Sequence, residues 1–177
     1  ARKSGEQESG LDSRGPDRYA PGMASTLVVI PTYNERDNVA PLAAAVRAAL
    51  PEADLLFLDD GSPDGTGDLL DRLAADDDRI RVLHRREKAG LGAAYLAGFR
   101  WSLEHGYERT VCMDADFSHD PGDLPRLREV LDGADLAAGS RYMPGGGIRN
   151  WSAHRRLLSH GGRLYARWLT GMPFTDP

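Results

Sequence analysis

Strand-like and helix-like segments alternate along the chain from residue 26 onward, and this alternation limits the folds that the chain can adopt. Short apolar runs typical of buried strands are each followed by a longer segment with helical spacing. Such an alternation predicts right-handed βαβ units, and therefore an α/β fold with a Rossmann-like, mostly parallel sheet and helices on both faces. The predicted strands are 26–30, 54–60, 79–85, 109–114 and 134–140, and the predicted helices are 38–50, 64–77, 91–106, 120–133 and 153–171.

Local signals indicate where several helices begin and end. Asn38 is suited to cap the helix that has Pro41 in its first turn. Gly106 and Gly133 are suited to end the helices that precede them. The only cysteine, Cys112, lies in an apolar strand and is expected to be an inert core residue.

Composition separates the first 24 residues from the rest of the chain. Residues 1–24 are rich in Gly, Ser, Pro and charge, which predicts a disordered tail or linker, whereas residues 25–177 suffice for one domain. The formal net charge of −5 argues against a general nucleic-acid binder. No apolar run reaches the roughly 20 residues of a membrane span, and no signal peptide is evident, so a cytosolic protein is expected.

Polar sequences follow four of the predicted strands. In parallel α/β sheets, ligands bind at the carboxyl ends of the strands, so these sequences are the candidate site. They are "PTYNE" at 31–35, "DDGSPDGT" at 59–66, "DADFSHD" at 114–120 and the glycine-rich "GSRYMPGGG" at 139–147.

Asp114 and Asp116 are the first candidates for metal ligands. Residues two apart share a face in an extended segment, so both carboxylates are expected to point to one place. Their mutual repulsion favours a compensating cation, and Mg²⁺ or Mn²⁺ is commonly held by one or two carboxylates plus substrate phosphates. The alternative is that Asp116 only begins a loop and caps a turn.

Asp59 and Asp60 form a second acidic pair at a strand end. One of them is suited to accept hydrogen bonds from a base or a ribose hydroxyl. The alternative, which this stretch alone favours, is that Asp, Gly, Ser and Pro occur here because they form turns. Residues 31–35 are likewise open to interpretation as a simple strand exit.

Taken together, these motifs resemble glycosyltransferase family 2, which has the GT-A fold, and more narrowly its polyprenol (dolichol) phosphate mannose synthases. The resemblance covers about residues 26–177. The stretches that carry it, in chain order, are "VVIPTYNERDNV", "LDDGSPDGT", "GLGAAYLAGF", "MDADFSHDP" and "AGSRYMPGGG".

The resemblance implies a reaction that moves mannose from GDP-mannose to a polyprenyl phosphate, with inversion at the anomeric carbon. It implies a metal and diphosphate motif made of Asp114, Ala115 and Asp116. The residues that it implies for the nucleotide pocket are Pro31, Tyr33, Glu35, Asp59 and Asp60.

An acceptor phosphate needs positioning more than a general base, because a phosphate monoester with a second pKa near 6 is largely a dianion at neutral pH. Guanidinium groups bind such a phosphate bidentately. Arg141 and Arg155 match the acceptor-phosphate arginines of the family. His119 is an alternative base, although a turn-stabilising role suits it as well.

The last predicted helix combines an apolar arc with a basic stripe, at about 100° per residue. Such a face suits a lipid surface with anionic headgroups, and a peripheral position at the inner face of the membrane, with a possible anchoring partner, is expected. The alternative, an ordinary amphipathic helix packed on the sheet, is favoured. The arc is Leu157, Leu158, Leu164, Tyr165, Trp168 and Leu169, and the stripe is Arg156, Arg163 and Arg167.

The chain departs from the family pattern at its end. It stops at "FTDP", residues 174–177, where the family continues into further helices on the acceptor side, so the catalytic domain is expected to be incomplete. Two alternatives follow from the same residues. One is a related transferase for another nucleotide sugar, such as a polyprenyl phosphate glucose synthase, and the other is an inactive nucleotide-sugar-binding fragment.

Overall fold

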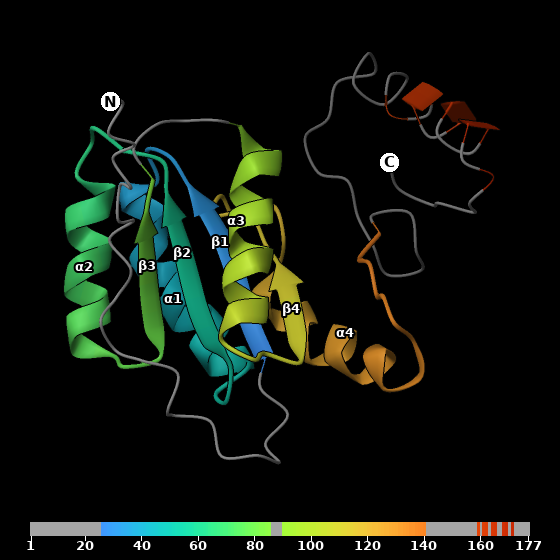
Figure 1. Cartoon of the computed structure of the whole chain (residues 1–177), viewed down its shortest axis with the longest axis horizontal. Helices are drawn as coiled ribbons and strands as arrows, with labels where there is room; N and C mark the ends of the chain where they lie inside the picture. The colour runs from blue at the N-terminus through green and yellow to red at the C-terminus, as the bar shows by residue number, and fades with distance from the viewer. Residues whose placement is uncertain are drawn as a thin grey trace, which may run out of the picture. The chain divides into compact units, whose positions relative to one another are not determined.

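The computed structural model describes residues 26–85 and 90–140, together with several residues between 159 and 171. The chain divides into two compact units, residues 1–125 and 126–177. In the first unit, four parallel strands form one sheet in the order β3-β2-β1-β4 (Figure 1). Its elements are β1 (Thr26–Thr32), α1 (Arg36–Ala49), β2 (Asp54–Asp59), α2 (Thr66–Asp76), β3 (Ile80–His84), α3 (Leu91–Glu104) and β4 (Arg109–Cys112).

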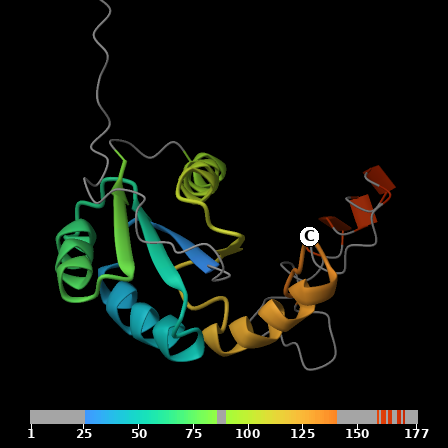
Figure 2. The same cartoon turned by 60° about the horizontal axis from the view of Figure 1, so that its bottom comes forward.

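The sheet is covered on both faces, which confirms the predicted α/β fold. Helices α1 and α2 lie on one face and α3 lies on the other (Figure 2). Strands β1 and β2 are buried on both sides, and this explains their continuous apolar sequences. The α1–α2 side of the core includes Val28, Ile30, Phe57, Leu42 and Leu70, and the α3 side includes Leu27, Val29, Leu56, Leu58 and Trp101.

Helix α3 approaches the sheet closely because it carries a glycine at the contact. Gly98 is buried, and a Cβ atom there would collide with the side chain of Val29 and lie 3.3 Å from Leu58 Cδ1. Protein interiors are packed too densely to absorb such a group without movement. The glycine therefore fixes how near the whole helix lies to β1.

The start of α1 differs from the sequence prediction. The helix begins at Arg36, with Glu35 at the N-cap position, and Asn38 lies inside it. The Asn38 side-chain amide donates to Glu35 Oε2 over 2.7 Å, so it reinforces the helix start without capping it. Pro41 consequently lies beyond the first turn. The other strands and helices of the first unit fall within a few residues of their predicted bounds.

The predicted strand at 134–140 is wrong. After the 3₁₀ turn Pro121–Asp123, α4 (Leu124–Val130) and a second 3₁₀ turn, Leu131–Gly133, residues 134–140 form no strand. The segment "ADLAAGS" has no β-branched or aromatic residue, and Ala, Gly, Ser and Asp form strands poorly. Its position after a helix is what suggested a strand, and its side chains do not support one.

Cys112 is exposed, which contradicts its predicted place in the core. It lies at the end of β4, and among the described strands β4 pairs only with β1. The apolar sequence of a strand thus did not guarantee burial at the edge of the sheet.

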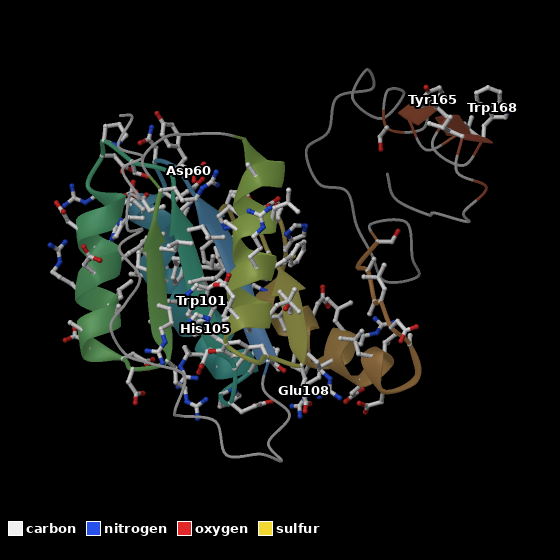
Figure 3. All side chains as sticks on the ribbon, viewed as in Figure 1. Asp60, Trp101, His105, Glu108, Tyr165 and Trp168 are labelled. Carbon is white, nitrogen blue, oxygen red and sulfur yellow. The ribbon has the colours of Figure 1, made fainter. Side chains whose placement is uncertain are left out.

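In the second unit, residues 141–158 lie outside the description, and the described residues from 159 to 169 are helical. The apolar side chains described there are exposed, and the rings of Tyr165 and Trp168 lie 6.3 Å apart (Figure 3). The basic stripe lies outside the described residues, so the predicted lipid-facing surface stays a prediction. Among described residues, no helix is long and apolar enough to cross a bilayer.

Candidate functional site

The polar ends of three neighbouring strands meet at one edge of the sheet. In register, Pro31 of β1 lies beside Leu58 of β2, and Val29 lies beside Cys112 of β4. Figure 3 shows Asp60 at this carboxyl end and Trp101 toward the opposite end. The fold therefore brings together the sequences after β1, β2 and β4, as the parallel sheet predicted.

The segments 33–36 and 60–66, which we call the loop pair, are joined by an unbroken series of hydrogen bonds. Three successive backbone N–H groups after β1 each donate to a side chain after β2. The bonds run from Asn34 to Ser62 Oγ (3.0 Å), from Glu35 to Thr66 Oγ1 (3.0 Å) and from Arg36 to Asp64 Oδ2 (3.3 Å). The Arg36 N–H is one of the free donors at the start of α1, and the other two lie just before the helix, so this pairing joins the helix start to both loops.

Asp59 is the buried centre of this network. Its Oδ1 accepts from Ser62 Oγ over 2.5 Å, and its Oδ2 accepts from the Ser62 N–H over 3.3 Å. The ring of His84 follows, with Nδ1 3.7 Å from Asp59 and Nε2 2.9 Å from Asp71 on α2. Asp59 therefore has a structural role in the loop pair, which is the turn-forming alternative considered for this stretch.

Asp60 is buried beside a basic side chain that the sequence did not single out. Arg85, at the end of β3, places Nη1 3.0 Å from Asp60 Oδ1 without the alignment of a hydrogen bond. The Arg85 backbone N–H also donates to the Asp59 carbonyl over 2.8 Å. The guanidinium offsets part of the cost of burying the Asp60 carboxylate.

The remaining predicted residues of the nucleotide pocket differ in exposure. Pro31 is half-buried in β1, and Tyr33 is exposed just after it. Glu35 is half-buried and accepts the Asn38 amide. Asn34, between them, has φ of 60°, a left-handed conformation that asparagine adopts more readily than most residues.

Residues 114–119, which we call the acidic turn, follow β4. The strand ends at Cys112, and Ala115 and Asp116 lie in a turn, so strand alternation does not set the relation between the two carboxylates as predicted. Asp114 is half-buried, Asp116 is exposed and Ala115 between them is buried. The acidic turn thus carries its two aspartates on either side of the buried Ala115.

Few bonds within the described residues hold the acidic turn. The Asp114 N–H donates to His119 Nδ1 over 3.2 Å, and the Ser118 N–H donates to Asp116 Oδ1 over 2.9 Å. The bond with the Ser118 side chain is the main cause that lowers the pKa of Asp116. His119 is exposed, and its Nδ1 is engaged with the backbone, which fits the turn-stabilising role better than a general base.

The Asp114 carboxylate is held from another element. Tyr95 on α3 donates its hydroxyl to Asp114 Oδ1 over 2.9 Å. Burial, followed by the bond and charge of Asp114, raises the pKa of Tyr95, so its hydroxyl stays protonated. Nothing in the local sequence around Asp114 indicated this tyrosine, although it lies within the quoted stretch "GLGAAYLAGF".

The residues Asp114 and Asp116 are suited to a hard divalent cation that also binds the phosphates of a ligand. Among the described residues, no cluster of three or more His, Cys, Asp or Glu side chains is suited to hold a metal without other ligands. Two carboxylates leave most of the coordination shell to water and to phosphate oxygens, which is the usual arrangement for Mg²⁺. The predicted acceptor residues Arg141 and Arg155 lie outside the described residues.

In a parallel α/β domain, ligands bind at the carboxyl ends of the strands, and the acidic sequences of this chain lie at those ends. Residues 27–176 match the profile described as Glycosyl transferase family 2, and the chain belongs to that family.

Two curated relatives share about half of their aligned residues with this chain. The polyprenol monophosphomannose synthase of Mycolicibacterium smegmatis is 53% identical over 97% of this chain and 65% of its own length. The undecaprenyl-phosphate mannosyltransferase of Micrococcus luteus is 52% identical over 85% of this chain and 62% of its own. The chain thus spans just under two thirds of the length of these relatives.

One solved structure is similar over a smaller part. A mannosyltransferase from Pyrobaculum calidifontis, in complex with GDP-Man and Mn²⁺, covers 43% of this chain and 24% of its own, with 21% identity and a TM-score of 0.40. A match at this level does not establish shared geometry, so the assignment to the family comes from the sequence.

Proposed function

We propose that the chain is the donor-binding part of an inverting transferase that moves mannose from GDP-mannose to a polyprenyl phosphate. The relatives named for this type of reaction share about half of the residues with this chain. The observation that carries the proposal is the acidic turn, whose two carboxylates lie at the carboxyl edge of the sheet next to the loop pair.

On the donor side, the loop pair would bind the nucleoside. Asp60 is a buried acceptor and Tyr33 an exposed ring at the same edge. Pro31 and Glu35 are half-buried beside them. The bonds between the two loops hold these side chains before the ligand arrives, which reduces the entropy that binding must remove.

On the diphosphate side, Asp114 and Asp116 would hold Mg²⁺ or Mn²⁺, with Ala115 as the buried residue between them. A divalent ion there would neutralise charge on the leaving diphosphate. Asp116 would contribute as an ionised carboxylate. The lowered pKa of Asp116 is consistent with that requirement.

On the acceptor side, Arg141 and Arg155 would bind the phosphate of the lipid. Their guanidinium groups stay charged and offer paired donors to phosphate oxygens. An acceptor that is already anionic can attack without a general base when it is held in line with the leaving group. We propose that the reaction takes place at the membrane surface, because the acceptor is a lipid, and that the protein lies at the inner face.

Calorimetry with a set of nucleotide sugars tests the donor assignment. GDP-mannose should bind in the presence of Mn²⁺ or Mg²⁺ and bind more weakly when EDTA removes the ion. Preference for a UDP-sugar would move the chain to a related transferase, such as a polyprenyl phosphate glucose synthase. A mannosyl-transfer assay with polyprenyl phosphate then separates an enzyme from an inactive nucleotide-sugar-binding fragment.

A further inference from the structure

The two carboxylates of the acidic turn differ in what holds them. Asp116 Oδ1 is bonded by Ser118, two residues along the same turn. Asp114 Oδ1 is bonded by Tyr95, which lies 19 residues earlier on a separate helix. Among the described residues, Tyr95 is the one group that hydrogen-bonds the Asp114 carboxylate.

Tyr95 is itself held in a defined place. It is half-buried and packs against the core on the α3 side of the sheet. Its ring lies 6.4 Å from that of Phe99, one turn further along α3. Gly98 in the same turn lets the helix approach β1, so the depth of the tyrosine hydroxyl is set by the packing of the whole helix.

The hydrogen bond from the Tyr95 hydroxyl engages one of the two carboxylate oxygens of Asp114. Oδ1 of Asp114 accepts the tyrosine hydroxyl, and the Asp114 backbone N–H is fixed by His119. The carboxylate therefore cannot rotate freely about its last bond without losing the bond from α3. Groups that orient a metal-binding side chain in this way contribute strongly to metal affinity.

We propose that Tyr95 is a positioning residue of the donor site, which holds Asp114 through Oδ1 so that Oδ2 is presented to the cation bound with the nucleotide diphosphate. This inference rests on the proposed function. It links α3 to the acidic turn and predicts that removing a single hydroxyl changes the metal requirement without removing any metal ligand.

The test is the variant Tyr95→Phe, which keeps the ring and its packing and removes only the donor. GDP binding is measured by calorimetry across a Mn²⁺ series, with the complete chain. We expect the Mn²⁺ concentration for half-maximal GDP affinity to rise about 10- to 100-fold. Affinity for GDP in EDTA should stay unchanged, because the loop pair is not altered.

Tyr107→Phe is the matched control. The Tyr107 hydroxyl donates to Asp54 Oδ2 over 2.6 Å, so this variant also removes a bond from tyrosine to aspartate on the same sheet. Asp54 is the first residue of β2, at the amino end and therefore away from the site. The thermal midpoint of the Tyr107→Phe variant is expected to fall, and the Mn²⁺ dependence of its GDP binding is expected to match that of the wild type.

A double-mutant cycle with Asp114→Asn completes the test. If the tyrosine acts through Asp114, adding Tyr95→Phe to Asp114→Asn should have no further effect on the Mn²⁺ requirement. Equal Mn²⁺ dependence in wild type and Tyr95→Phe, additive effects in the cycle, or equal losses with Mn²⁺ and with EDTA would each overturn the inference. Failure of the wild type to bind GDP or GDP-mannose would instead contradict the proposed function.

Discussion

The loop pair and the acidic turn lie at the same edge of the sheet but are stabilised in different ways. The loop pair is joined by three bonds from backbone N–H groups and a fourth from the Arg36 guanidinium to the Asp64 carbonyl, and it is centred on the buried Asp59. The acidic turn has an exposed second acid, and among the described residues its first acid accepts one bond from another element. One part of the proposed site is therefore held by bonds within the chain, whereas the other would need a ligand and a cation to complete it.

This difference predicts whether a mutation in each region should first lower the stability of the fold or the affinity for ligand. In the loop pair, side chains of one loop pair the backbone N–H groups of the other, so their removal should first lower the stability of the fold. In the acidic turn, side chains that face solvent contribute little to folding, so their removal should first lower ligand binding. The variants Asp116→Ala, Asp59→Ala and Thr66→Val each change one of the two regions.

The largest effect is expected for Asp116→Ala. GDP-mannose affinity in Mn²⁺ should fall by at least about 100-fold, because the loss of a ligand exceeds the effect of losing its supporting bonds. The stability should change by less than about 0.5 kcal/mol, since the side chain is exposed. Calorimetry and urea denaturation check the two parts.

Asp123→Ala is the control for that variant. Asp123 is also exposed and lies close in sequence, so the change in charge is the same. Its affinity should match that of the wild type. Unchanged affinity in Asp116→Ala, with and without the metal, would remove Asp116 from the site.

Asp59→Ala should give the opposite result. The change leaves the Ser62 N–H and hydroxyl without their acceptor, and we expect a loss of about 2–4 kcal/mol in the free energy of unfolding. GDP affinity should fall by a similar factor with Mn²⁺ and with EDTA. Asp71→Ala removes the exposed carboxylate on the far side of His84 and should cost less than about 0.5 kcal/mol. A stable Asp59→Ala variant would show that the loop pair does not depend on this centre.

Thr66→Val should have a smaller effect of the same kind. Thr66 is fully buried, and its hydroxyl accepts the Glu35 N–H and donates to Asp64. Its removal should cost about 1–2 kcal/mol, because the partly buried Glu35 N–H is left without this acceptor. Thr66→Ser keeps the hydroxyl and should recover most of the loss in a urea titration. Equal losses in both variants would point to packing as the cause.

The sequence was sufficient to predict the parts of the molecule that depend on local pattern. β1 and β2 follow from continuous apolar runs, and the loops after β1, β2 and β4 follow from the rule that ligands bind at such ends. The prediction at 134–140 is wrong because the alternation of elements favours a strand there whereas the residues themselves form strands poorly. Arg85, His84 and Tyr95 were missed because each reaches the site from an element distant in sequence, and only the packed sheet brings them there.

The roles of the acids were also harder to predict than their presence. The two-residue spacing of Asp114 and Asp116 predicts a shared strand face, yet the strand ends at Cys112, before both. Asp59 and Asp60 are adjacent in sequence, but one bonds to the loop and the other lies beside Arg85. Asp59 is the last residue of β2 and Asp60 follows the strand, so two acids adjacent in sequence have different partners and need not act as a pair.

The smallest expected effect is the pH dependence of the stability that comes from ionisation of Asp116. In the folded protein the pKa of Asp116 is lowered from 3.8, so the ionised form is favoured there. A lowered pKa gives a contribution to stability that is present above 3.8 and is lost as the pH falls through the folded value. An NMR titration of the metal-free protein should place this carboxyl below 3.8, with no change of its charge between neutral pH and pH 5. A midpoint above 3.8 would contradict the role of Ser118.

The most direct test of the central claim is the anomalous scattering of Mn²⁺ in crystals soaked with GDP-mannose. The account predicts one peak within about 2.0–2.6 Å of carboxylate oxygens of Asp114 and Asp116 and of the diphosphate. A bound nucleotide with the ion elsewhere, or with both aspartates turned away from it, would contradict the account.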